Sequence, residues 1–295
     1  MDGIINVYKE KGYTSFDVVA KLRGILKQKK IGHTGTLDPD AQGVLPVCLG
    51  KATRVCDLLT DKEKEYEAVL LLGRTTDTQD TTGQTLKELP VTCTEEEVRA
   101  TIAGFVGPYD QIPPMYSALK VNGQKLCNLA RAGIEVERKP RRITIHAIDI
   151  LEVKLPRVKL RVRCSKGTYI RTLCHDIGET LSCGGCMEEL LRTRVGQFTA
   201  GEAHRLDEIE QAVADGRLES YIAPVDSVFA GYPAVRIRKE FDKLLYNGNP
   251  LPAEACMEPV RKTGADRLRV YDAGGRFIGI YEWRAQRLKP VKLFL

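Results

Sequence analysis

The feature that most constrains the fold is a short stretch, residues 158–164, in which apolar and basic side chains alternate strictly. The apolar positions are Val158, Leu160, Val162 and Cys164, and the basic positions between them are Lys159, Arg161 and Arg163. Successive side chains of a β-strand point to opposite faces of a sheet, so this period of two predicts a strand with one buried and one basic face.

Helical patterns flank this strand. Ser15 is expected to cap a helix that runs to residue 26, and Thr94 and Glu97 form the capping box of a helix that reaches residue 105. A second strand is predicted at 66–72, and a helix should follow the Ser-Lys-Gly turn at 165–167. The chain is therefore expected to be an α+β protein with a mixed, largely antiparallel sheet.

The character of the chain changes near Gly231-Tyr232-Pro233, after which short strands predominate around one short helix near 239–246. The loop 272–275 is typical of a hairpin between strands 267–271 and 276–283. We predict a large domain, 1–230, and a small β-rich domain, 231–295. Within the first, 31–50 is expected to be a loop and 107–142 a long, partly mobile basic excursion, because both are rich in glycine and proline.

Charge and composition narrow the function only a little. The net charge of +6 is compatible with a nucleic-acid partner without requiring one. With no apolar run of membrane length and no signal-peptide pattern, a cytoplasmic location is expected, and the nine cysteines are interpreted as reduced thiols. Cys183 and Cys186 form a CxxC without the second pair that zinc ribbons need, so no metal site is predicted.

The most informative segment for chemistry is Gly32–Pro46, with Asp38 at its centre. Pro39 biases Asp38 away from helical geometry, and the surrounding glycines let the backbone approach a ligand closely. Taken alone, such an aspartate also fits a structural turn. The spacing from Gly43 to Lys51 does not match a phosphate-binding P-loop, and no cofactor fingerprint is present, which leaves nucleophile or acid–base group as the functional alternatives.

This segment resembles the catalytic-loop motif GHxGTLDPxAxGxLP of the TruB branch of pseudouridine synthases. Four further motifs resemble the same family in the same order, namely KEY at 64–66, RTTDTQDTTG at 74–83, IPPMYSALKVNG at 112–123 and SKGTYIRT at 165–172. The resemblance covers essentially the whole chain, and more weakly the C-terminal region resembles the family's PUA domain. One departure is Leu191, where the family commonly has arginine.

The resemblance implies conversion of uridine to pseudouridine at position 55 in the T loop of tRNA, without metal or cofactor. It implies that Asp38 is the catalytic aspartate, that Tyr66 is a catalytic tyrosine that packs on the base and helps to remove the C5 proton, and that Arg171 pairs with Asp38. Without the family, structural interpretations are favoured for two of these residues, Tyr66 as a half-buried strand tyrosine and Arg171 as a surface arginine at the start of a helix. An opposite charge favours the ionised carboxylate, so Arg171 is expected to keep Asp38 charged.

The remaining site predictions concern the RNA. The target base must be flipped out of its loop, and the resemblance implies that His33 lies beside the flipped nucleotide and that Tyr169 and Leu190 line the uracil pocket. Phosphate contacts are expected from basic residues that position RNA without reading its sequence. They are Lys51, Arg54, Lys166, Arg138, Lys139, Arg141 and Arg142. The excursion at 107–142 resembles the family's mobile thumb.

Two rival functions remain on sequence alone. One is a catalytically idle RNA-binding or tRNA-folding protein on the same scaffold, which an intact Asp38, Tyr66 and Arg171 disfavour. The other is the related RNA-guided synthase that works inside a ribonucleoprotein, whose additional terminal segments have little room in 295 residues. A monomer that acts on the T-arm of tRNA, with no membrane and no obligatory protein partner, is the expectation.

Overall fold

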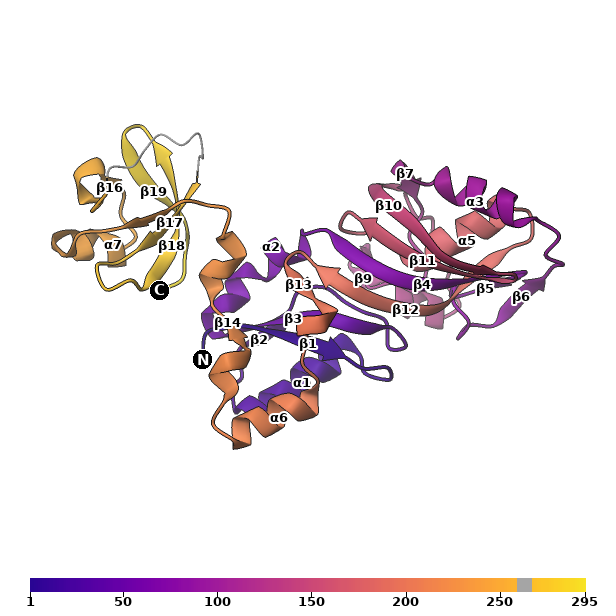
Figure 1. Ribbon diagram of the computed structural model, residues 1–295, viewed down its shortest axis with the longest axis horizontal. Helices are drawn as coiled ribbons and strands as arrows, with labels where there is room; N and C mark the ends of the chain where they lie inside the picture. Colours follow the sequence, from indigo (N-terminus) through magenta and orange to yellow (C-terminus); the bar gives the residue numbers. More distant parts are fainter. Residues whose placement is uncertain (259–266) are drawn as a thin grey trace.

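The computed structural model describes residues 1–258 and 267–295, which form a ten-stranded sheet, a five-stranded sheet near the C-terminus and two short ribbons (Figure 1). The strand order of the large sheet is β14-β1-β3-β12-β4-β11-β10-β7, with β13 beside β12 and β2 beside β3. Its strands are β1 (Gly3–Lys9), β2 (Ile31–His33), β3 (Gln42–Leu49), β4 (Lys64–Leu72), β7 (Gly107–Gln111), β10 (Arg141–Lys154), β11 (Arg157–Cys164), β12 (Gly185–Val195), β13 (Phe198–Thr199) and β14 (Ile222–Ala223).

The described residues also form α-helices and two short ribbons. The helices are α1 (Ser15–Leu26), α2 (Cys56–Thr60), α3 (Glu95–Ala103), α4 (Leu126–Arg131), α5 (Ile170–Thr180), α6 (Leu206–Ala214) and α7 (Asp242–Tyr246). The ribbons pair β5 (Arg74–Thr76) with β6 (Thr85–Glu88), and β8 (Lys120–Val121) with β9 (Gln124–Lys125). The predicted α+β class is confirmed.

A narrow seam joins the two halves of the large sheet. Strand β12 pairs with β4 over most of its length but with β3 at only two positions, Leu191 with Gln42 and Arg192 with Gly43. The β3–β12 pairing is parallel, whereas the other ladders of the large sheet are antiparallel. The sheet is therefore mixed and largely antiparallel, as predicted. Gly43 has a φ of +105°, and a Cβ there would lie 2.2 Å from the Arg192 carbonyl oxygen, so glycine is required for the two halves to approach.

The alternating stretch is confirmed as β11. Its four apolar side chains are all fully buried, and they share a core with α3 and α5. The capping box of α3 is confirmed as well, because the Thr94 amide donates to the Glu97 carboxylate at 2.7 Å and the Glu97 amide donates back to the Thr94 hydroxyl. The helix itself ends at Ala103, two residues earlier than predicted.

Three local predictions are wrong. Thr14, not Ser15, caps α1, since Thr14 exchanges hydrogen bonds with Asp17 while Ser15 points inward. Residues 31–50 are not a loop throughout, because β2 and β3 occupy both ends of the range. Strand β3 is buried on both faces and so shows no period of two, and the loop narrows to 34–41.

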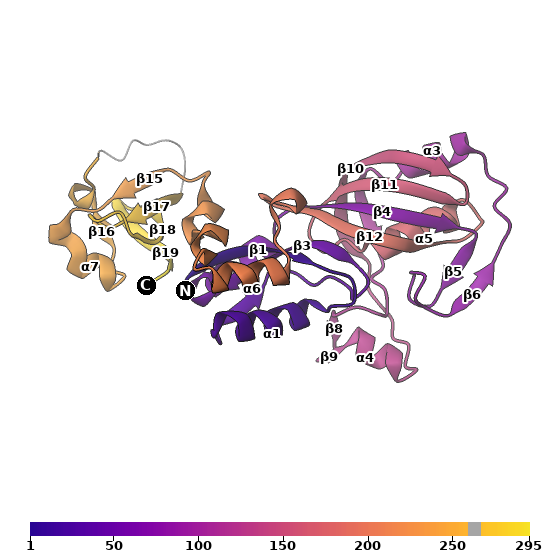
Figure 2. The ribbon, with the colours of Figure 1, turned by 60° about the horizontal axis from the view of Figure 1, so that its bottom comes forward.

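The third wrong prediction is the extent of the basic excursion at 107–142, because the two ends of this range belong to the sheet. Strand β7 pairs with the start of β10, with Arg141 opposite Gln111. The excursion is therefore residues 112–140, which carry β8, β9 and α4 and project from the body (Figure 2). We call this segment the thumb.

The C-terminal sheet has its own buried core and the strand order β15 (Ala234–Arg236), β17 (Arg267–Tyr271), β18 (Phe277–Arg284), β19 (Arg287–Leu293) and β16 (Leu251–Pro252). The β17–β18 hairpin and a short helix at 239–246 are as predicted. This curled sheet is PUA-like and lies at one end of the large sheet (Figure 1). Phe229, Phe277 and Phe294 pack together between the two. In the described part of the chain, no helix is both long and apolar enough to cross a membrane.

Candidate active site

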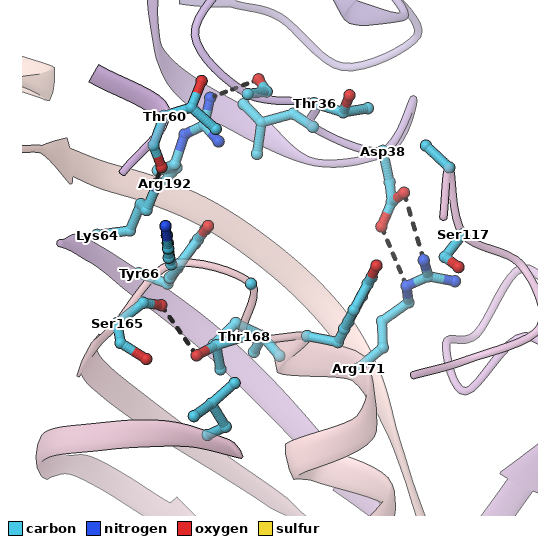
Figure 3. A pocket seen from close by; sticks show the side chains of 18 of the residues that line it. Thr36, Asp38, Thr60, Lys64, Tyr66, Ser117, Ser165, Thr168, Arg171 and Arg192 are labelled. Atoms are coloured by element: carbon cyan, nitrogen blue, oxygen red, sulfur yellow. Dashed lines mark hydrogen bonds and ion pairs between the residues drawn. The ribbon is translucent and has the colours of Figure 1, made fainter. Parts of the chain in front are cut away.

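The loop that carries Asp38 is held on both sides by buried polar groups. On one side, the Leu37 amide donates to the Ser15 hydroxyl at 2.9 Å. On the other, the Lys9 ammonium donates to the Pro39 carbonyl at 3.0 Å. Because these bonds fix the backbone on both sides of Asp38, they also restrict the orientation of its side chain, which faces Arg171 (Figure 3).

Arg171 pairs with Asp38 through two contacts, 3.0 Å from Nε to Oδ2 and 3.4 Å from Nη2 to Oδ1. The guanidinium is only 6% exposed. Its other N–H groups reach the Thr78 carbonyl at 3.0 Å, the Tyr116 carbonyl at 2.7 Å and the Asp80 carboxylate at 3.6 Å. Arg171 is therefore buried, and all of these groups accept its hydrogen bonds or form ion pairs with it. Its position at the start of a helix had suggested a surface arginine.

The ion pair does not make Asp38 an ordinary carboxylate. Burial raises the pKa of Asp38 above its usual value of 3.8, and the nearby Asp80 raises it further, while Arg171 opposes both. Arg171 therefore favours the charged form of Asp38, in the expected direction, while burial opposes it. Desolvation is the larger effect, and a desolvated carboxylate is a stronger nucleophile than a hydrated one.

A second wall faces this pair and is formed by neighbouring strands. Tyr66 on β4 lies opposite Arg192 on β12, and both are buried, at 8% and 1% exposure. Burial raises the pKa of the Tyr66 hydroxyl, and the adjacent Arg192 guanidinium lowers it. Arg192 donates to the Val44 carbonyl at 2.7 Å and to the Gly35 carbonyl at 3.4 Å, which ties β12 to β3 and to the Asp38 loop.

Between the two walls lies a pocket of about 670 Å³ (Figure 3). Of the predicted site residues, Asp38, Tyr66, Arg171, Tyr169, Leu190, Lys166, Arg141 and Arg142 line it. Tyr169 is fixed by Gln111, which both donates to its carbonyl and accepts from its amide. Lys166 forms an exposed ion pair with Asp61 at 2.8 Å, and Arg142 forms one with Asp110 at 2.8 Å.

The other predicted residues lie elsewhere. Within the described ranges, the pocket lining does not include His33, which sits at the end of β2 and accepts a hydrogen bond from the Gly35 amide. Arg54 donates to the Leu293 carbonyl at 2.6 Å and so contacts the C-terminal sheet, and Lys51 lies three residues before it in the same helical turn. On the thumb, Arg138 is engaged by Glu135 and by the Pro113 carbonyl, and Lys139 is exposed.

Sequence reasoning missed four polar residues near the site, the buried Lys9, Lys64 and Arg192 and the half-buried Asp80. Lys64 was detectable, because the period of two that places Tyr66 and Ala68 inward also places Lys64 inward. Arg192 was detectable in the same way from Leu190. Lys9 and Asp80 carry no such signal, since their burial depends on partners distant in sequence.

The thiols show no arrangement typical of a metal site. No group of three or more metal-ligating side chains is found in residues 1–258 and 267–295. All nine cysteines are free, and Cys174 and Cys186 are buried, with pKa values that burial raises. Thiols of this kind are inert packing residues.

Comparison with known protein families agrees with the geometry. Residues 23–170 match the model of the TruB family pseudouridylate synthase N-terminal domain, and residues 171–230 match that of the tRNA pseudouridylate synthase B C-terminal domain. A protein of Lachnoclostridium phytofermentans named tRNA pseudouridine synthase B is 58% identical, with all of both chains covered. The protein of the same name in Clostridium kluyveri is 46% identical, again over the full length of both.

Solved structures of similar fold are more distant in sequence. A chain of a Cbf5–Nop10–Gar1 complex is 28% identical with a TM-score of 0.74, and 99% of this chain and 85% of that chain are covered. A chain of an H/ACA ribonucleoprotein bound to a substrate RNA containing 2′-deoxyuridine is 25% identical with a TM-score of 0.73 at the same coverage.

Proposed function

The chain belongs to the TruB family of pseudouridylate synthases, isomerases of uridine in tRNA, and from this premise we propose that it modifies uridine 55 in the T loop, with Asp38 as the nucleophile. The observation that carries the proposal is the two-point ion pair between Asp38 and Arg171 on the wall of a pocket. At about 670 Å³ the pocket falls in the range of small-ligand sites, about 300–1,000 Å³, and can hold a flipped nucleotide.

The reaction is an isomerisation and needs no external reagent. The N1–C1′ bond breaks, the ring turns, a C5–C1′ bond forms, and the proton lost from C5 is balanced by one gained at N1. Three routes remain open for Asp38: attack on C1′ of the ribose, attack on C6 of uracil, and promotion of a glycal route. All three require the ionised carboxylate. Arg171 supports that state and fixes the carboxylate orientation.

The other lining residues supply contacts of two kinds. Tyr66, Tyr169 and Leu190 offer aromatic and apolar surface for an extruded base. Lys166 and Arg141 stand on the pocket wall, where they suit phosphates of the T-arm. His33 is proposed to approach the vacated stack.

We extend the proposal to the organisation of the chain. The domain of residues 1–230 would carry catalysis, with the thumb gripping the T-arm, and residues 231–295 would form a second RNA-binding domain. Cbf5 is solved in complexes with protein partners. For this chain we propose a monomer that acts on tRNA without an obligatory protein partner.

The test is Asp38→Asn, which keeps the size of the side chain and removes its charge. Pseudouridine in the T loop of unmodified tRNA, mapped by chemical labelling, should disappear, while the affinity for tRNA changes by less than about threefold. Full activity of this variant would disprove the role of Asp38. A wild-type protein that binds tRNA and forms no pseudouridine would instead favour the idle RNA-binding protein.

A further inference from the structure

Three buried cations near the pocket have no carboxylate partner. Lys9, Lys64 and Arg192 are at most 6% exposed. Backbone carbonyls accept their hydrogen bonds, those of Glu10, Tyr13 and Pro39 for Lys9, of Thr60 and Lys62 for Lys64, and of Val44 and Gly35 for Arg192. Within the described residues, none of the three lies within ion-pair distance of an acidic side chain. Buried charge without a counterion is costly and needs an explanation.

Arg192 is the centre of this group. It is the largest fully buried side chain of the protein, and it lines the pocket together with Lys64 and Tyr66. Burial lowers the pKa of Lys9 and of Lys64 to about 8, and the charge of Arg192 contributes to both shifts. Arg192 and Lys64 line the same pocket, and Lys9 lies beside the Asp38 loop, where it donates to the Pro39 carbonyl at 3.0 Å.

The two walls of the pocket differ in sign. Asp38 and Asp80 offset the charge of Arg171, whereas Arg192 has no acidic side chain of the described residues within ion-pair distance. Figure 3 shows Arg171 beside Asp38, and Arg192 on the other side of the pocket near Tyr66. A ligand between the walls consequently experiences a negative group on the side of Asp38 and a positive field on the side of Tyr66.

The proposed reaction generates a matching charge. When the N1–C1′ bond breaks, its electron pair remains on uracil, delocalised over N1, O2 and O4, and the ring is an anion until C5 bonds to C1′. Preorganised positive charge in a water-excluded site stabilises such a species, because it needs no reorganisation during the reaction.

We propose that Arg192, supported by Lys64, stabilises the uracil anion during its detachment and rotation. This inference rests on the proposed function, and it adds a further charged group to a site in which Asp38 and Arg171 act on the bond that breaks. Arg192 lies on the strand side of the pocket, beside Tyr66.

The experiment compares Arg192→Met with Arg194→Met in single-turnover reactions on a T-arm RNA. Arg194 lies two residues further along β12, pairs with Glu65 at 3.7 Å and is absent from the described lining of the pocket, so it is the matched control. Arg192→Met should slow the reaction by about 100-fold, the effect of losing one charge-stabilising group, with unchanged RNA affinity. Arg194→Met should react within about twofold of the wild type.

A second substrate separates charge stabilisation from a structural role. Fluorine at C5 withdraws electrons and stabilises the uracil anion, so the defect of Arg192→Met should shrink at least about fivefold on RNA with 5-fluorouridine, measured as consumption of the target nucleotide. A defect of equal size on both substrates, or no defect on uridine, overturns the proposal.

Arg192→Lys is the second variant in case Arg192→Met does not fold. It keeps the charge, so it should retain at least about a tenth of the wild-type rate and the wild-type ratio of rates on the two substrates. A folded Arg192→Lys protein that falls below this rate or shows an altered ratio also overturns the inference. Because the wild type and Asp38→Asn are measured in the same assay, failure of the proposed function is seen separately, as a wild type that forms no pseudouridine.

Discussion

The two walls of the pocket each bury an arginine, and they do so in opposite ways. Arg171, at the start of α5, is surrounded by the carboxylates of Asp38 and Asp80 and by two carbonyls. Arg192, in the middle of β12, has carbonyls and the Tyr66 hydroxyl around it. The first arginine is neutralised by the protein itself, and the second is not.

Under the proposed function, this difference lets one site position a nucleophile and stabilise a leaving group at the same time. The field of a cation that is paired with a carboxylate is largely cancelled by that carboxylate, so such a cation suits the role of orienting Asp38. The field of a cation that is held by neutral carbonyl groups is not cancelled, and it acts on a ligand in the pocket. The second arrangement needs a rigid backbone, and the seam between β3 and β12 provides it.

The largest expected loss of stability comes from a change in the seam between β3 and β12. In Gly43→Ala the new Cβ would meet the Arg192 carbonyl at 2.2 Å, at a φ of +105°. We expect the free energy of unfolding to fall by about 4 kcal/mol from backbone strain and overpacking, measured by urea denaturation. Gly12→Ala is the control, because its φ of +90° is also unfavourable but nothing lies within 4 Å of the added atom. Equal losses in the two variants would show that the close approach at Gly43 does not matter.

A smaller effect should distinguish the two arginines by stability. Arg171→Met leaves Asp38 and Asp80 without their cation, and we expect a loss of about 3 kcal/mol, at the lower end for a buried pair because Asp38 is 40% exposed. Arg192→Met removes a desolvated charge that has no counterion but also the donor to the Val44 and Gly35 carbonyls, and because these two effects oppose each other its free energy of unfolding should stay within about 1 kcal/mol of the wild type. Similar losses in both urea titrations would contradict the contrast between the walls.

The same contrast shows what the sequence could and could not predict. Strand β11 and the hairpin β17–β18 follow from period and turn chemistry, which are local. Strand β3 was missed because burial on both faces removes the period and because Gly43 and Pro46 imitate a loop. The position of Ser15 inside the protein, rather than at the cap, depends on Leu37, which is distant in sequence.

The ion pair between Asp38 and Arg171 could be predicted only through the family motif. Nothing local to Arg171 reveals that it is buried, since its acceptors lie on three other segments, around Asp38, Thr78 and Tyr116. For Arg192 the local pattern was available, because Leu190 and Arg192 share one face of a strand. Leu191, which lies between them and departs from the family motif, was considered instead of Arg192.

The burial of Lys9, whose ammonium is bonded to backbone carbonyls, should make the free energy of unfolding depend on pH. Burial lowers the pKa of Lys9 from 10.5 to about 8, so between these values the unfolded chain binds more protons than the folded one. Stability from this group must therefore rise with pH in that window, by roughly 2–3 kcal/mol in total for a fully buried amine. We expect the wild type to gain this amount relative to Lys9→Met between pH 8 and 10.5. Parallel pH profiles of the two proteins in urea titrations would mean that Lys9 is not desolvated.

The smallest effect concerns cations that meet phosphate rather than uracil. Lys139 and Arg141 are exposed, at the end of the thumb and the start of β10. Changing both to glutamine should reduce the slope of log affinity against log salt by about 0.7–0.9 for each phosphate that the protein no longer neutralises, measured by RNA titration at several salt concentrations. Arg157→Gln, an exposed arginine paired with Glu188 at 2.7 Å, is the control and should leave the slope unchanged. Arg192→Met should also leave it unchanged, because a buried guanidinium releases no counterions. A change of slope in Arg192→Met would place that arginine among the phosphate-binding residues and remove the distinction between the walls.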